Sequence, residues 1–561
     1  MKQEEDEEQP LPSIASTSNP PTAELNTEEK ELINREARLN EAIDTNLRSN
    51  VDRDPRVVWM LYAFAFFYTL AITLLSHIAA SEWYHVYEVS LKYQHFFRVF
   101  MAVVPCIGAV LSDSYLGKWW TLVLGTLTFQ VGAILVVLFS IPNIVGGGQI
   151  VSDGLSFMPL AIVALGAGFI APTIEAFGGD QFLAIQDRGR DRYFSLLYFV
   201  SGLAYVLARF IFSSLQAWHR QRTDVLLRKG SMHNAIVAAC STLVLFPIVW
   251  KGRRRFRMVS SMHELVPFKV LKTAVVAISL YVSAWPTERA AATHWLNFAS
   301  RSEGSLFVQE LYDSSLALAP ILLPTFCFFV TGRYADRYDS SASQYFLGGY
   351  NALNEAVGSE FHSFNYVTLV LVLLLAFVVY PFANHRGWNV SLYRRMGAGY
   401  VSMMVATVLS VIVHDAAAAT FYRELPSGMR DGYLYGSSRP VCQTCISPWV
   451  SIPPFFFMAM AFALVMPTAA QVVFIESGPH LRTLAMAVWI VFQTASDEVS
   501  LRITDSATEK DTRAMHIIFG SISVAGIVLY LTITHYYTPR KQRASINNAA
   551  HLVKEAEFAK P

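Results

Sequence analysis

Several ionisable side chains stand within or beside long apolar stretches, where an unpaired charge is energetically costly. His95 lies near the start of one such stretch, in Tyr93-Gln-His-Phe-Phe, and Arg98 follows three residues later. Histidine can titrate near neutral pH, so His95 could take up and release a proton. Arg98, on roughly the same helix side, could hold His95 neutral or bind an anionic group. A hydrogen-bonded histidine at the edge of an apolar segment explains His95 equally well.

Three further charged residues extend this set. Glu175 lies four residues after Ala171, on the same face of a helix. If Glu175 faces a cavity, it would need a counter-charge or a proton, as a carboxylate in a proton relay does. Because it lies near the end of its helix, it could equally be an ordinary carboxylate at the membrane interface. Glu288 and Arg289 are adjacent and point in different directions, so we expect each to pair with residues elsewhere.

A charged turn punctuated by glycine, residues 108 to 121, separates two long apolar stretches. We expect Asp113 to end one helix, Gly117 to let the backbone bend or approach a neighbour, and Lys118 to open the next helix. Such a turn can bind another helix terminus through its charge. An ordinary solvated hairpin between two helices also fits this pattern.

Composition indicates the class of protein that must position these residues. The chain of 561 residues is 53% hydrophobic and only 16% charged, whereas soluble domains carry about a quarter charged residues. Apolar runs of roughly 20 residues recur, long enough to cross a bilayer as helices. The net charge of +1 gives no support for nucleic-acid binding. The five cysteines, including Cys442 and Cys445 in one polar loop, form neither a disulfide framework nor a complete metal site.

The apolar segments predict twelve transmembrane helices in two halves of six. An acidic tail, 1–55, which we expect to be disordered and cytosolic, precedes them. The predicted parts are an N-terminal bundle at 56–250, a basic cytosolic linker at 251–267, a C-terminal bundle at 268–537 and a cytosolic tail at 538–561. Six segments fall in each bundle: 57–80, 95–113, 118–141, 156–176, 193–216 and 233–250, then 268–286, 364–384, 396–414, 450–474, 482–496 and 515–537.

One apolar segment, 316–332, does not fit this count. It contains Pro320 and Pro324, and a thirteenth span would move the carboxyl terminus across the membrane. We therefore interpret it as part of a loop, 301–363, inserted between helices seven and eight, where it could form a re-entrant or interfacial element.

Several motifs together resemble the proton-dependent oligopeptide transporter family, the peptide-transporter branch of the major facilitator superfamily. Residues 171–182, Ala-Pro-Thr-Ile-Glu-Ala-Phe-Gly-Gly-Asp-Gln-Phe, are similar to the family pattern K-P-x-x-x-A-F-G-G-D-Q-F. This match includes Gly178, Gly179 and Asp180, which we interpret as a helix exit at the cytoplasmic surface. Trp285 stands in a stretch similar to the family's helix-seven pattern, and residues 108–121 resemble the superfamily's loop between helices two and three. The resemblance implies the superfamily's fold of twelve helices.

The chain departs from the family where the family's charges should lie. The resemblance places E-x-x-E-R-F at Met60–Ala65, which carries none of those charges, and the helix-four lysine at Ala171. The helix-seven acid falls at Arg289, and the helix-ten glutamate falls at Phe462 in a loose alignment. Membership is therefore better supported than the family's mechanism.

These observations predict an integral, multi-pass membrane transporter of the plasma membrane or an endomembrane, not an enzyme. The expected cargo is a small peptide or related solute, moved by alternating access, with the proton as coupling ion and no other cofactor or metal. Candidate pathway residues are His95, Arg98, Glu175, Trp285, Glu288 and Arg289. Two alternatives remain open: a relative that acts as a membrane receptor or scaffold without transporting, and a uniporter of another solute.

Overall fold

The computed structural model describes the chain in thirteen pieces. All belong to one compact unit, Asp54–Pro561. The pieces are residues 57–81, 87–140, 153–182, 187–220, 227–252, 314, 318, 321–332, 362–388, 390–424, 447–478, 481–506 and 512–536. The predicted acidic tail, nearly all of the basic linker, and Trp285, Glu288 and Arg289 lie outside these residues.

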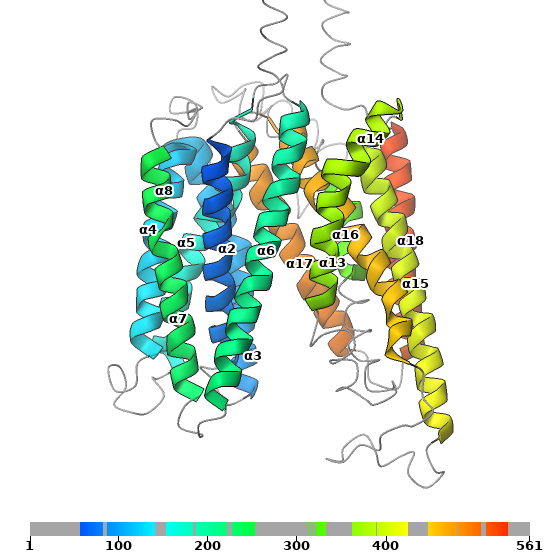
Figure 1. Ribbon diagram of the computed structural model, residues 1–561, viewed down its shortest axis with the longest axis horizontal. Helices are drawn as coiled ribbons and strands as arrows, with labels where there is room; N and C mark the ends of the chain where they lie inside the picture. The colour runs from blue at the N-terminus through cyan, green and yellow to red at the C-terminus, as the bar shows by residue number, and fades with distance from the viewer. Residues whose placement is uncertain are drawn as a thin grey trace, which may run out of the picture. The chain divides into compact units, whose positions relative to one another are not determined.

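The first half of the unit is a bundle of long helices. In it, α2 packs on α6 and α7, α3 packs on α5, and α4 packs on α5 and α7. The elements are α2 (Val58–Ser81), α3 (Tyr87–Leu111), the π-helical turn η1 (Ser112–Leu116), α4 (Gly117–Ser140), α5 (Asp153–Gly179), α6 (Asp187–Arg220), α7 (Leu227–Leu243) and α8 (Leu245–Gly252). These helices lie together in Figure 1, coloured blue to green.

The second half repeats this packing. Helix α13 packs on α16, as α3 packs on α5, and α15 packs on α16 and α18, as α4 packs on α5 and α7. The elements are α13 (His362–Leu374), η5 (Leu375–Val379), α14 (Tyr380–His385), α15 (Leu392–Glu424), η7 (Pro448–Ser451), α16 (Ile452–Glu476), α17 (Arg482–Ser506) and α18 (Thr512–Tyr536). The repeat makes α16 the counterpart of α5, and α18 the counterpart of α7.

The helices are apolar enough to lie in lipid. Within the described residues, nine segments have the length and hydropathy needed to cross a membrane. Large apolar side chains stay exposed on the outer faces, among them Ile517 at 69%, Val370 at 63% and Leu531 at 61%. Helices that are apolar on both their packed and their exposed faces suit a bilayer. This finding confirms the predicted all-α, multi-pass membrane protein.

Glycines bring α4 and α5 into close contact. A Cβ atom on Gly166 would lie 2.4 Å from the backbone nitrogen of Phe129, and one on Gly132 would lie 2.7 Å from that of Val163. Neither helix could come so near with a larger residue at these positions. Close packing of this kind replaces the hydrophobic driving force, which lipid does not supply between helices.

Residues 321–332 form an apolar helix inside the second half. Phe329 contacts Trp489 of α17 at 5.6 Å between ring centroids, and Val330 clusters with Phe519 of α18. The Thr325 hydroxyl lies 2.8 Å from that of Tyr400 on α15. The described part of the predicted loop segment 316–332 is therefore packed among the helices of the second half.

Candidate functional site

The turn between α3 and α4 contacts the start of α17 from the other half. Gly117 adopts a φ of +74°, a left-handed conformation that favours glycine. Asp113, buried in the π-helical turn before it, accepts a hydrogen bond of 2.9 Å from the backbone nitrogen of Leu484. A carboxylate at this position also interacts favourably with the α17 helix dipole. The structure thus brings Asp113 to a helix terminus.

Asp180 at the end of α5 lies between two cations. Lys118 of α4 donates to Oδ2 of Asp180, and Arg482 of α17 donates to Oδ1. The Asp180 side chain is 0% exposed, so it depends on these partners for the stability of its charge. We call Asp113, Lys118, Asp180 and Arg482 the first ion-pair cluster. It joins the turn η1 and the helices α4, α5 and α17, and thus both halves.

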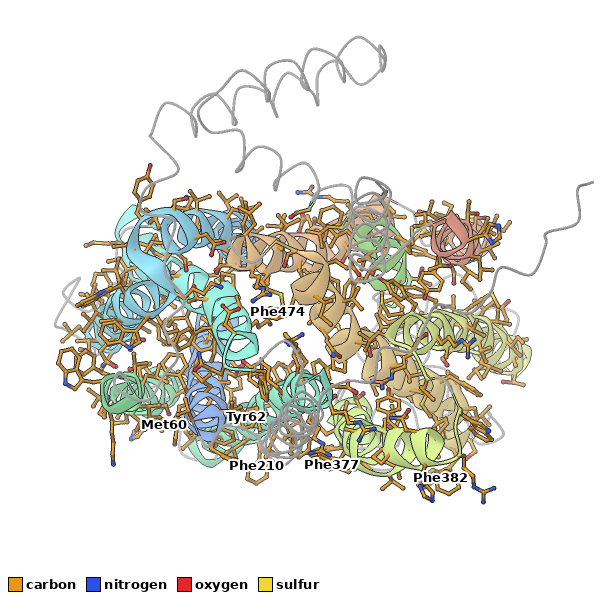
Figure 2. The ribbon with its side chains drawn as sticks, turned by 90° about the horizontal axis from the view of Figure 1, so that it is seen from above. Met60, Tyr62, Phe210, Phe377, Phe382 and Phe474 are labelled. Atoms are coloured by element: carbon orange, nitrogen blue, oxygen red, sulfur yellow. The ribbon has the colours of Figure 1, made fainter. Side chains whose placement is uncertain are left out.

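An aromatic ring fills the junction beside this cluster. Phe474 of α16 lies against Gly179, where a Cβ atom would come within 2.6 Å of the ring. The Arg482 guanidinium lies 4.4 Å and the Arg190 guanidinium 5.6 Å from the ring centroid, distances typical of cation–π contacts. Figure 2 shows Phe474 on α16, facing the first half. Gly179 is therefore needed for this close approach.

A second ion-pair cluster, Asp191, Arg395 and Tyr380, joins the halves at the same end. Nη1 of Arg395 on α15 lies 2.8 and 2.9 Å from the two carboxylate oxygens of Asp191 on α6. The Arg395 guanidinium also covers the Tyr380 ring at 3.6 Å from the centroid. The turn before α15 contains Gly387 at a φ of +73°, much as Gly117 precedes Lys118. We call this end, at the top of Figure 1, the seam end.

Glu175 lies on α5, one turn before Gly179. Its Oε2 atom is buried, and no described residue is a hydrogen-bond partner for it. Tyr68 of α2 and Tyr193 of α6 lie within electrostatic range of the carboxylate. Their hydroxyls donate to backbone carbonyls of α5, Tyr68 to Ala167 at 3.2 Å and Tyr193 to Ile174 at 3.0 Å.

Other predicted site residues are only partly placed. His95 and Arg98 lie on α3, but their side chains are outside the described set, as are Trp285, Glu288 and Arg289 altogether. The structure does place Gly178, where a Cβ atom would lie 1.9 Å from the Tyr193 hydroxyl. The functional roles of all these residues stay predictions.

Sequence reasoning missed Arg482, Phe474 and Asp191 as members of the site. Arg482 lies 302 residues from Asp180, and Arg395 lies 204 residues from Asp191. One usable signal was Arg395, a charged residue near the start of α15 that follows the Gly387 turn. Together the two clusters provide charged contacts that join the halves.

Comparison with known proteins places the chain in a family. The model of the POT family matches residues 119–519. The chain is 25% identical to human solute carrier family 15 member 2 over 373 residues, which is 64% of this chain and 48% of that protein. It is also 25% identical to dog solute carrier family 15 member 1 over 339 residues, 58% of this chain and 46% of that protein. The chain thus spans about half the length of these curated relatives.

Solved structures share the architecture. A crystal structure of the peptide transporter POT in complex with sulfate gives a TM-score of 0.53 at 16% identity, covering 86% of this chain and 94% of that one. The major facilitator superfamily proton:xylose symporter XylE gives 0.50 at 13% identity, covering 88% and 97%. These likenesses confirm the predicted major facilitator fold. The chain belongs to the POT family of transporters, which are membrane carriers and not enzymes.

Proposed function

We propose that the protein carries a small peptide or peptide-like solute across its membrane by alternating access, with the proton as coupling ion. Family membership supports the carrier role, and the peptide cargo is an extension from similar structures described as peptide transporters. The observation that carries the proposal is the pair of ion-pair clusters between the halves. Charged contacts hold one end together in one state and can separate in the other.

In this mechanism the described state is closed at the seam end. Asp180 connects α4, α5 and α17 through Lys118 and Arg482, and Asp113 caps α17. Opening this end requires water or cargo to replace those partners, because a stranded buried carboxylate is costly. Binding of cargo and proton in the centre supplies free energy for that exchange.

Glu175 and His95 are the proposed coupling residues. Glu175 lies one helical turn from the seam at Gly179, and its carboxylate has a buried oxygen without a described partner. A protonated Glu175 would be neutral, which lowers the cost of its passage through the closed, dry state. His95 keeps its predicted role because a histidine can exchange protons near neutral pH.

We also propose that residues 321–332 belong to the seventh helix of the fold. In the first half, α2 packs on α6 and α7, whose counterparts are α17 and α18. The 321–332 helix contacts both counterparts, so it occupies the position of α2. The Ser314 hydroxyl accepts a hydrogen bond of 3.1 Å from Gly478 in the α16–α17 turn, at the seam end, which is also where α2 begins.

This assignment changes the side of the membrane on which the long connection between α8 and residue 314 should end. Because α8 ends and residue 314 lies at the seam end, residues 253–313 begin and end on one side. A single cysteine at Ser302 should react with a membrane-impermeant maleimide only from the side that α8 reaches. Labelling from the opposite side would restore 268–286 as the seventh helix.

Uptake by the purified full chain in liposomes tests the transport proposal. Labelled dipeptide should accumulate above empty liposomes, and more strongly with an inward proton gradient. Glu175→Gln and His95→Ala should remove the gradient effect, whereas Asp415→Asn, at an exposed carboxylate on α15, should not. Absence of accumulation under both conditions contradicts the peptide claim.

One observation favours a second candidate, a relative that binds peptides without proton-coupled transport. The resemblance places the family's charged helix-one residues at positions 60 to 65 of α2. This chain has Met60 and the fully buried Phe64 at two of the charged positions, so the charges that the family uses there are missing. A receptor of this kind would gain thermal stability on adding di- and tripeptides, because the ligand binds only the folded state. It would show no uptake in the same liposomes.

A further inference from the structure

Tryptophan side chains gather at the seam end of the first half, where α4 begins and α8 ends. Trp119 and Trp120 lie in the first turn of α4, and Trp250 lies in the last turn of α8, followed by Lys251. The Trp119 ring centroid lies 4.6 Å from that of Trp120 and 6.3 Å from that of Trp250. The two helices are in contact, as Figure 1 shows. With Phe246, which stacks on Trp250, these residues form what we call the tryptophan patch.

The tryptophan patch is accessible from outside the bundle. Trp120 is 50% exposed and Trp250 is 52% exposed, whereas Trp119 between them is buried. The membrane-spanning segment His233–Lys251 ends within the patch, so its side chains lie near the depth of the lipid headgroups. Indole rings suit this depth because they combine an apolar body with one polar N–H group.

Other exposed tryptophans differ from the patch in their surroundings. Trp388 is 66% exposed and Trp449 is 58% exposed, and each fits the general belt of aromatic residues at a membrane interface. In the patch, two half-exposed tryptophans from separate helices instead converge on a buried third, and a lysine stands in the same helical turn as one of them. This arrangement suits one defined headgroup better than the interface in general.

We propose that the tryptophan patch binds the headgroup of a phosphocholine lipid. Aromatic rings attract a quaternary ammonium group, which has no N–H donors and therefore needs no hydrogen-bond acceptors. Lys251 is exposed and supplies a positive charge for the phosphate. A phosphoethanolamine headgroup has N–H donors, and the side chains of the patch offer no acceptor for them. A phosphoglycerol headgroup has no cation for the rings.

The outer face of α4 also offers a surface for the acyl chains of such a lipid. Leu124 lies one turn after Trp120 and is 41% exposed, and Leu127 and Val131 further along α4 are 47% and 52% exposed. A lipid whose headgroup lies on the patch can therefore lay its acyl chains along this helix. The proposed site lies on the outside of the first half and does not depend on the cargo that the protein carries.

Native mass spectrometry of the purified full chain tests the proposal. The chain is released from bilayers that contain phosphocholine, phosphoethanolamine and phosphoglycerol lipids in equal amounts and with the same acyl chains. Wild type should retain the phosphocholine lipid with a preference of about tenfold over each of the others. Trp120→Leu and Trp250→Leu, on different helices, should each reduce this preference to about twofold or less. Trp250→Phe keeps a ring and should retain part of it.

A matched control and a folding check accompany these variants. Trp388→Leu removes an exposed tryptophan outside the patch and should behave as wild type. Melting temperatures in bilayers of phosphoglycerol lipid alone identify the variants that are folded, and either Trp120→Leu or Trp250→Leu is enough for the test. Equal retention of the three lipids by wild type would overturn the proposal, as would an unchanged preference in a folded leucine variant. A preference of wild type for phosphoglycerol would show that positive charge selects the lipid, and it would overturn the choice of phosphocholine.

Discussion

The two ion-pair clusters join the same halves with different surroundings. Asp180 of the first cluster is completely buried and shared by Lys118 and Arg482, whereas the side chain of Asp191 in the second is 26% exposed and faces one arginine. Removing the buried Asp180 carboxylate leaves two cations without their partner. Removing the partly exposed Asp191 carboxylate costs less, because water can solvate the arginine in its place. The comparison indicates that the first cluster contributes most to closure and that the second adjusts it.

Asp180→Asn should have the largest effect of any single change at the seam. It removes the charge shared by Lys118 and Arg482, and we expect the closed state to lose about 3 to 5 kcal/mol relative to the open one. A cysteine at Ser477, which is 2% exposed in the closed seam, reports opening by its rate of maleimide labelling. The labelling rate should rise by roughly a hundredfold to a few thousandfold.

The labelling experiment uses a background in which the five native cysteines are replaced. Asp415→Asn is the matched control and should leave the rate unchanged, because the Asp415 side chain is 61% exposed. An unchanged rate in Asp180→Asn would contradict the dominance of the first cluster.

Gly179→Ala should open the seam by a steric route. Its Cβ atom would lie 2.6 Å from the Phe474 ring, an overlap that we expect to cost about 1 to 3 kcal/mol. Phe474→Leu should relieve the overlap, so the double variant should label more slowly than Gly179→Ala alone. If Phe474→Leu brings no such rescue, the glycine does not act through this contact.

Arg395→Lys tests the second cluster. Lysine keeps the charge but loses the planar group that covers Tyr380 at 3.6 Å, so we expect a loss of about 1 kcal/mol. The Ser477 cysteine should label roughly fivefold faster, far less than in Asp180→Asn. An effect as large as that of Asp180→Asn would show that the clusters contribute equally.

Asp113→Asn should have the smallest effect. The amide oxygen can still accept the hydrogen bond from the Leu484 nitrogen, and what is lost is the charge that interacts with the α17 dipole and with Lys118, about 0.3 to 1 kcal/mol. Asp113→Ala removes both and should cost about 1 to 2 kcal/mol. Equal labelling rates for the two variants would indicate that the hydrogen bond is unimportant.

Much of the fold could be predicted from the sequence because apolar runs mark helices in lipid. The predicted segment 118–141 agrees with α4 at Gly117–Ser140 to within one residue. Segment 482–496 was too short, since α17 continues to Ser506 through polar residues that end the apolar run but not the helix. The position of 321–332 could not be predicted, because a short apolar run with prolines has the same pattern in a loop or a bundle.

In the candidate site, only the features formed by neighbours in the sequence could be predicted. The turn around Gly117 indicated that Asp113 would meet a helix terminus, but Leu484 lies 371 residues away. Likewise, Asp180 was recognised as a helix exit, while its partner Arg482 comes from the other half. Sequence patterns describe neighbours along one helix, and pairing between distant helices depends on tertiary packing.

The central claim is that the two clusters hold the seam end closed and that the carrier works by opening it. Spin labels at Lys251 and Arg386, exposed positions near the seam end in opposite halves, measure the separation directly. The account predicts that this distance is shorter in wild type without cargo than in the double variant Asp180→Asn, Arg395→Lys. The same distance distribution in both proteins would contradict it.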